Sequence, residues 1–434
     1  QSVGGGEAQG QARRVVFLGQ ASAPGSAGPA PITIFAGRHT IGDKNEYVIL
    51  FDAIDKQQTY NEARLTGLLS NSTFAHNPAI AKNRLYETIL KSLHAFHADS
   101  SVEVELQRLL HYTEILFKKS LYDESRKILH RARKLAFRYE KHFSMLEIQK
   151  WEKRLIERDS YASNNLDDIN GMLQQDEDMI GRLKNYVDFW NIKSRLFLLL
   201  NKKGKVRDND ELNNFKTIID NTLLASEDEA LSYESRYLYY QIYSAYFFGI
   251  GDYTNSYIYI SKHLELIEEN AELFDEEPNK YFAVLSNMIY VCTQLRKLNE
   301  IPALLQKLKK IPENYVRKMN EDMEIKLFSS SFSAELSLYI QTGEFDMALS
   351  LVDDIDSGLN RYENKVSKIR VAYFCFNLAI VYFALGNYSG ALKWINRLLN
   401  DSDIDSSQDI HCMGRILNLI IHLEMGNSDL IPYT

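Results

Sequence analysis

The sequence is poor in cysteine, in proline and in long apolar runs, and each shortage excludes a class of protein. Its 434 residues include 3 cysteines and 8 prolines. Three widely spaced thiols cannot form the dense disulfide framework of a small secreted domain. No run of about 18 apolar residues occurs, so the sequence predicts no membrane insertion. We therefore expect buried thiols, a reducing compartment and a cytoplasmic location.

The common catalytic and metal-binding motifs are also missing. There is no HExxH, no GxSxG, no Walker loop and no CxxC pair. His94, His97 and His111 lack a carboxylate spaced to complete a zinc site. Acidic residues alternate over 401–409 as in a calcium loop, but Ser406 stands where the sharp turn needs glycine. The sequence thus predicts no metal, no cofactor and no enzymatic activity.

Charge is unevenly distributed along the chain, whose net charge is −8. Residues 81–160 contain 17 basic and 12 acidic residues, whereas residues 161–434 contain 27 and 40. An acidic body repels nucleic acids and anionic membranes, so we expect a neutral or basic partner. The dense basic residues between Lys118 and Lys141 leave two alternatives open, a solvated helix face or a patch for an acidic partner or RNA.

The chain begins with two segments that differ from the rest. Residues 1–34 are rich in glycine, alanine and serine and bury too little apolar surface to order themselves, so they are expected to be a disordered tail or an added leader. Over 35–100 we expect a small N-terminal helical cap, in which Leu50, Phe51 and Ile54 share one apolar face and Pro78 opens a longer helix. A DNA-reading head is the alternative for this segment, but residues 60–70 contain only one basic residue, Arg64.

Repeats dominate the remainder. Three segments, 116–132, 339–355 and 382–398, share a frame in which a turn residue is followed by an aromatic two residues later and a small residue three further on. The turn residue reverses the chain between two helices, and the small residue lets these helices approach closely. The frame is occupied by Ser120, Tyr122 and Ser125, then by Gly343, Phe345 and Ala348, and finally by Gly386, Tyr388 and Ala391. A fourth copy has Gly251, Tyr253 and Ser256, and a degenerate fifth is centred on Arg296.

From Ser120 to Gly426 the series contains eight turns at a mean spacing of about 44 residues, with the second near 160–164 and the third at Gly204. Each helix is therefore expected to be near 20 residues long. The pattern resembles the tetratricopeptide-repeat (TPR) superfamily in a long-helix form, over residues 80–434. The resemblance implies an all-α fold, with a right-handed superhelical solenoid of about eight antiparallel helix pairs over 101–434.

Aromatic residues are concentrated over 233–259, which contains several tyrosines on two faces of one expected helix. Two explanations for these residues remain open, packing between neighbouring repeats and a tyrosine-lined binding groove.

The resemblance also implies a function, that of a non-enzymatic scaffold or adaptor that binds a peptide segment or partner protein in a concave groove. The first helix of each pair lines that groove in the family, which assigns the partner-binding positions to Asn287, Tyr290, Tyr373, Phe376, Asn377, Ile380 and Phe383. The lysines and arginines that some relatives use for a terminal carboxylate are not found at the matching positions. Two alternatives remain, a peptide- or ligand-sensing regulator with a helix-turn-helix-like head and an α-helical enzyme without a recognisable motif.

Overall fold

The structure is a computed structural model, and it describes residues 46–55, 57, 61, 67, 78–96, 101–162, 164–315, 319–401 and 409–427. Within these residues every regular element is a helix, which confirms the all-α prediction. The chain divides into two compact units, Gln1–Tyr112 and Thr113–Thr434. In the part of the chain that is described, no helix is both long enough and apolar enough to cross a bilayer.

The first unit contains α3 (Glu46–Asp55), α5 (Pro78–Phe96) and the first part of α6 (Val102–Lys118). Leu50, Phe51 and Ile54 of α3 are buried, as their shared face predicts. Pro78 is the first residue of α5, also as predicted, because its missing N–H would have no partner in the first helical turn. The leader 1–34 and most of the segment 56–77, where the DNA-reading head was considered, lie outside the described residues.

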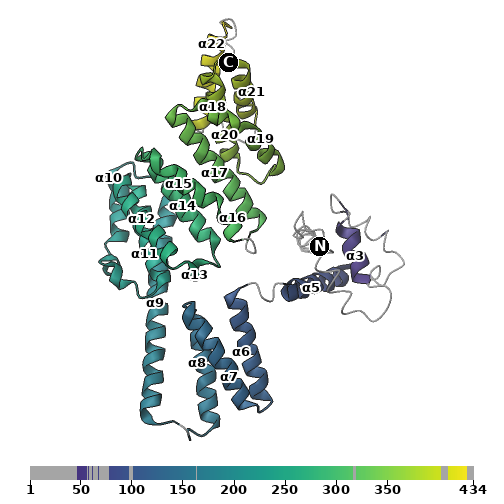
Figure 1. Cartoon of the computed structure of the whole chain (residues 1–434), viewed down its shortest axis with the longest axis vertical. Coiled ribbons are helices and arrows are strands. Elements are labelled where there is room, and N and C mark those ends of the chain that lie inside the picture. The colour runs from purple at the N-terminus through teal and green to yellow at the C-terminus, as the bar shows by residue number, and fades with distance from the viewer. Residues whose placement is uncertain are drawn as a thin grey trace, which may run out of the picture. The chain divides into compact units, whose positions relative to one another are not determined.

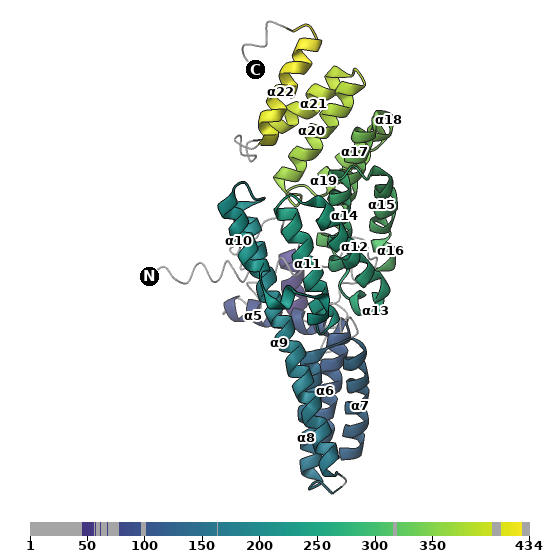
Figure 2. The same ribbon diagram turned by 90° about the vertical axis from the view of Figure 1, so that its left-hand side faces the viewer.

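In the second unit, helices that are consecutive in the chain pack on each other (Figures 1 and 2). They are α7 (Tyr122–Arg138), α8 (His142–Arg158), α9 (Leu166–Lys203), α10 (Asn209–Ile219), α11 (Tyr233–Gly249), α12 (Tyr253–Glu269), α13 (Ala271–Phe274), α14 (Pro278–Gln294), α15 (Ile301–Lys309), α16 (Ile311–Asn314), α17 (Glu321–Thr342), α18 (Phe345–Ser350), α19 (Val352–Arg361), α20 (Lys368–Ala384), α21 (Tyr388–Leu399) and α22 (Asp409–Glu424). Short 3-10 turns are η2 (Thr222–Leu224), η3 (Glu227–Glu229) and η4 (Leu298–Glu300).

The turns predicted from the repeats all contain a residue with left-handed backbone. Gly251, Gly343 and Gly386 have φ of 79°, 77° and 72°, and Arg296 adopts 55° without being glycine. The next N–H then donates to the carbonyl five residues earlier, as from Asp252 to Phe247 at 2.8 Å. This hydrogen bond closes the end of the first helix while the chain reverses into the second.

The small residue of the frame lies where two helices touch. Ser125, Ala348 and Ala391 have no exposed surface, and Ser256 is 1 % exposed. The serine copies add a hydrogen bond, because the Ser256 hydroxyl donates to the Ser244 carbonyl at 3.0 Å, and Ser125 makes the equivalent bond to Thr113 at 3.1 Å. The same contact thus recurs in repeats far apart in the chain.

Helix α9 departs furthest above the expected length. Between the predicted turns near 160 and at Gly204, the spacing predicts two helices of about 20 residues each, but α9 is a single helix of 38 residues. Its start is capped reciprocally by Asn165 and Asp168, and it ends at Gly204, where φ is 74°. Gly171 and Gly181 lie inside α9 without breaking it, since an internal glycine costs only about 1 kcal/mol.

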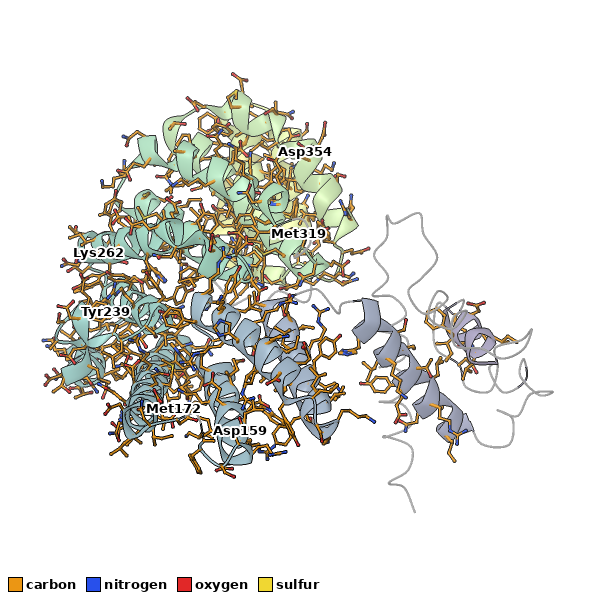
Figure 3. The ribbon with its side chains drawn as sticks, turned by 60° about the horizontal axis from the view of Figure 1, so that its bottom comes forward. Asp159, Met172, Tyr239, Lys262, Met319 and Asp354 are labelled. Carbon is orange, nitrogen blue, oxygen red and sulfur yellow. The ribbon has the colours of Figure 1, made fainter. Side chains whose placement is uncertain are left out.

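Among the described residues from α9 onward, buried side chains form two clusters. The middle cluster extends from Phe189 to Leu338 and the C-terminal cluster from Leu336 to Ile421. Both tyrosine faces of α11 belong to the middle cluster, so packing accounts for them, and Figure 3 shows the side chains around Tyr239 filling the space between helices. Buried thiols are confirmed for Cys292 and Cys375, but the prediction is wrong for Cys412, which is exposed because its face of α22 meets no neighbouring helix among the described residues.

Candidate functional site

A groove of about 970 Å³ runs along the second unit. Its walls come from the C-terminal end of α9 and from α11, α14, α17 and α20, which are first helices of successive repeats. Ser256 and Ile260 of α12 and Leu308 of α15 contribute from the second helices. The groove is therefore lined mainly by the helices that precede the turns at Gly204, Gly251, Arg296, Gly343 and Gly386.

Lys205 lies at one end of the groove, directly after the Gly204 turn. Its Nζ donates to the hydroxyls of Tyr253 at 2.5 Å and Tyr290 at 3.4 Å and lies 4.9 Å from the centre of the Phe248 ring. Burial alone would lower the pKa of Lys205, but these tyrosine contacts raise it above the ordinary value. The ammonium group therefore stays charged and is held in place by three aromatic rings.

Arg370, from the first turn of α20, lies at the other end beside a serine-rich face of α17. Its guanidinium donates to the Ser333 hydroxyl at 3.4 Å, a long hydrogen bond. Ser330 and Ser337 line the groove next to it. Arg370 and Lys205 are the only charged residues in the groove wall as the structure describes it, so the wall is positive within an acidic body.

Amide and hydroxyl groups occupy much of the wall between these two cations. The Asn287 amide is exposed and makes no hydrogen bond to any described residue. The Ser286 hydroxyl is buried and likewise finds no hydrogen-bond partner in the described part of the chain. A buried hydroxyl without a partner is costly, and a bound polar group would satisfy it.

The structure separates the predicted groove residues into two groups. Asn287, Tyr290 and Tyr373 line the groove. Four others lie further along α20, outside the groove wall: Phe376, Asn377, Ile380 and Phe383. Phe376 and Phe383 pack against the C-terminal cluster, and the Asn377 amide donates to the Tyr373 carbonyl at 2.8 Å within its own helix. Their assignment as partner-binding residues stays a prediction that this geometry does not favour.

Sequence reasoning missed Lys205 and Arg370. Neither residue lies in the repeat frame that the sequence shows, since Lys205 follows the end of α9 and Arg370 lies in the first turn of α20. The Gly204 turn was visible in the sequence, but nothing local indicates that the residue after it points towards α14.

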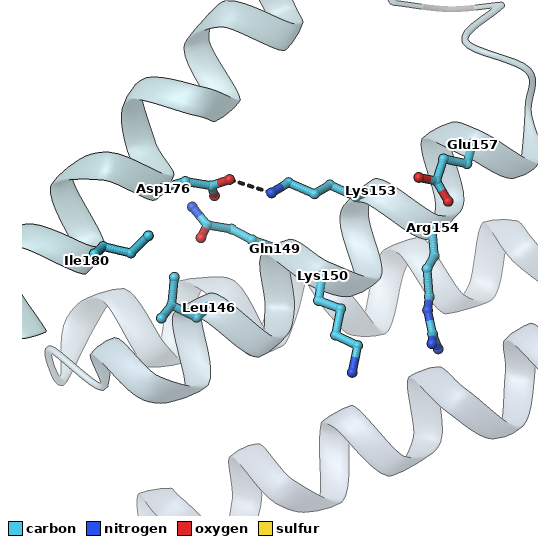
Figure 4. A pocket seen from close by; sticks show the side chains of 8 residues that line it. All are labelled: Leu146, Gln149, Lys150, Lys153, Arg154, Glu157, Asp176 and Ile180. Carbon is cyan, nitrogen blue, oxygen red and sulfur yellow. Dashed lines mark hydrogen bonds and ion pairs between the residues drawn. The ribbon is translucent and has the colours of Figure 1, made fainter.

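A smaller cleft of about 420 Å³ lies between α8 and α9 (Figure 4). Lys153 pairs with Asp176 across it, and Leu146 and Ile180 lie at one end. Gln149 is 2 % exposed, and neither its amide nitrogen nor its amide oxygen meets a hydrogen-bond partner among the described residues. The cleft combines one polar and one apolar end, and no group of residues in it suggests a reaction.

The basic residues of α7 are largely engaged in ion pairs. Arg126 pairs with Asp159, Arg133 with Glu152 at 2.7 Å, and Arg138 with Glu272 at 2.7 Å. These acids come from α8, from the turn after it and from α13, so folding neutralises much of the patch. Most of the positive charge that an RNA-binding surface would need is therefore already neutralised.

Histidines and acids do not gather into a metal site in the described residues, where no group of three or more possible ligands occurs. His94 and His111 are exposed, while His97 and the acidic segment 402–408 lie outside the described residues.

No protein-family model matches the chain, and no curated protein matches it significantly. What the chain does must therefore be inferred from its own residues.

Proposed function

We propose that this chain is a non-enzymatic interaction protein that binds an extended polypeptide segment in the groove between Lys205 and Arg370. The observation that carries the proposal is the groove itself, whose described wall combines amides and hydroxyls with aromatic and aliphatic side chains and has two charged residues, both cations. An extended peptide exposes unpaired N–H and C=O groups along its length. Side chains that both donate and accept, such as Asn287 and Gln294, suit such a backbone.

The arrangement of the second unit supports a right-handed solenoid of about eight TPR-like helix pairs as the frame of this site. Turns with the same hydrogen bond recur at Ser120, Gly251, Arg296, Gly343 and Gly386, and the helices pack with their neighbours in the chain. In a solenoid each repeat contacts only the adjacent ones, which leaves one continuous face of first helices for a ligand.

The charges of the groove indicate which kind of peptide segment would bind in it. Lys205 and Arg370 have no acidic neighbour in the described groove wall, and burial between low-dielectric walls strengthens their field. A segment with a carboxylate, from an acidic side chain or a chain end, would be attracted, whereas a basic segment would be repelled. This revises the expectation from net charge, which favoured a neutral or basic partner.

The test is a selection of peptides from a random library displayed on phage, with the whole chain as bait. Enriched peptides are expected to contain acidic residues. Binding of a fluorescent copy of one such peptide is then measured by anisotropy for the wild type, Asn287→Ala and Arg370→Glu. We expect each substitution to weaken binding at least tenfold, about 1.4 kcal/mol, because it removes a backbone partner or reverses a groove charge.

Lys134→Glu is the matched control, since Lys134 is an exposed basic residue of α7 outside the groove. It should leave binding unchanged, and all variants should melt at the wild-type temperature. Enrichment of no peptide at all would contradict the proposal. A loss of binding in Lys134→Glu with normal binding in Arg370→Glu would move the site to α7.

A further inference from the structure

Helix α9 has a row of exposed apolar side chains that the groove does not use. The row repeats every seven residues and comprises Leu166, Leu173, Ile180 and Val187, which we call the apolar row. These side chains are 75 %, 56 %, 56 % and 52 % exposed. A seven-residue repeat stays on one side of a helix, drifting by only about 20° per heptad. Over its length of roughly 32 Å, such a row is typical of a helix that packs against another helix.

A polar row runs beside the apolar row, four residues further along each time. It comprises Asn170, Glu177, Lys184 and Asn191, all of which are exposed. Glu177 makes no ion pair with any described residue. The Lys184 side chain is 77 % exposed, and within the described part of the chain its one ion pair is with Asp188, one turn away at 2.6 Å, a contact that solvent screens. The two rows correspond to the a and d positions of a helix–helix seam.

The order of charges in the polar row decides which partner fits. Glu177 and Lys184 lie on either side of Ile180, close to the middle of the row. In a parallel pair of α9 helices, each charge would meet its own copy and be repelled. In an antiparallel pair, Glu177 of one chain lies within one turn of Lys184 of the second copy, and the symmetry makes this attraction twice.

We infer that α9 is a self-association surface, on which a second copy of this chain packs antiparallel through the apolar row. The two apolar rows interdigitate along one edge of the seam, while Glu177 and Lys184 pair across the other edge. Ile180 and Leu146 lie at one end of the small cleft between α8 and α9, so the second copy also covers that apolar end (Figure 4). This inference is independent of what the groove binds.

The experiment measures the mass of the whole chain in solution by light scattering over a wide range of concentration. The wild type is expected to be a dimer. Leu173→Glu should weaken self-association at least tenfold, because it places a charge in the apolar row. Met347→Glu is the matched control, since Met347 on α18 is 51 % exposed but lies off the seam, and it should leave the dimer intact.

Charge reversal tests the antiparallel orientation. Glu177→Lys and Lys184→Glu, each alone, should be largely monomeric, because each juxtaposes like charges twice. An equal mixture of the two variants should form a dimer that contains one chain of each, as seen by native mass spectrometry. A wild type that stays monomeric at all concentrations would overturn the inference, as would a dimer that survives Leu173→Glu. A mixture that stays monomeric would overturn the antiparallel pairing.

Discussion

At the scale of single residues, the local environment decides whether a glycine in a helix is a weakness or a requirement. A side chain at Gly358 would place its Cβ 2.0 Å from the ring of Phe328, whereas a side chain at Gly171 would meet nothing within 4 Å. Phe328 cannot move away easily, because it contacts the rings of Phe332, Tyr362 and Phe374.

Gly358→Ala is therefore expected to destabilise the protein by about 1–3 kcal/mol through overpacking. Gly171→Ala should stabilise it by up to about 1 kcal/mol, because alanine favours the helix and the site is open. Urea unfolding of both variants measures the two changes. Equal effects of the two substitutions would show that the close approach at Gly358 is not present in solution.

His263 is a buried histidine that must stay neutral in the folded protein. It lies against Tyr237 and Tyr240 of α11, with ring centres 4.2 and 6.3 Å away, and Lys280 of α14 adds a positive charge nearby. Burial, and to a lesser extent Lys280, lowers the pKa of His263 to about 3.

The unfolded chain binds a proton at this histidine below about pH 6.5, whereas the folded chain does not until near its own lower pKa. We therefore expect stability to fall as the pH decreases from about 6.5 towards 3, by up to about 1.4 kcal/mol per pH unit from this residue. His263→Gln should flatten that slope in melting curves between about pH 7 and pH 5. An unchanged slope in this variant would show that His263 does not carry the effect.

At the scale of elements, the turns at Gly251, Arg296, Gly343 and Gly386 share one hydrogen-bonding pattern and differ in how well their residues suit a positive φ. Gly386 and Arg296 occupy equivalent turns with φ of 72° and 55°. The following N–H donates to the carbonyl five residues earlier in both, from Asn387 to Tyr382 and from Lys297 to Cys292, each at 2.9 Å. Only glycine adopts this backbone without a steric cost.

Gly386→Ala should cost about 1 kcal/mol, and Arg296→Gly should stabilise the protein by several tenths of a kcal/mol to about 1 kcal/mol. Opposite shifts of the melting temperature are the expected result. A stabilising Gly386→Ala would contradict the common turn geometry. Arg296→Ala serves as the control, since it removes the side chain while keeping the steric cost.

At the scale of the whole molecule, the charge of the groove differs from that of the chain, and the buried side chains form separate clusters. The chain is acidic overall, yet both charged residues of the described groove wall are cations. The middle and C-terminal clusters meet at α17, which supplies Leu338 to one and Leu336 to the other. Burial in this part of the chain is therefore divided between two clusters that adjoin in the sequence.

The sequence by itself determined the helical class, the positions of the turns and the buried small residues such as Ala348 and Ala391. These features are local, because a turn needs a residue that tolerates positive φ and a helix joint needs a small side chain at a set distance from it. The length of α9 could not be predicted, since the glycines inside it weaken a helix without ending it.

Tertiary structure alone decided which side chains share the groove. Lys205 and Tyr290 are 85 residues apart, and their contact depends on how the end of α9 packs beside α14. Asn287 and Tyr373 were predicted and do line the groove, whereas Asn377, one helical turn after Tyr373, donates to its own helix. Periodicity indicates which face of a helix points inwards, but the position along that face where a groove opens depends on the packing of neighbouring repeats.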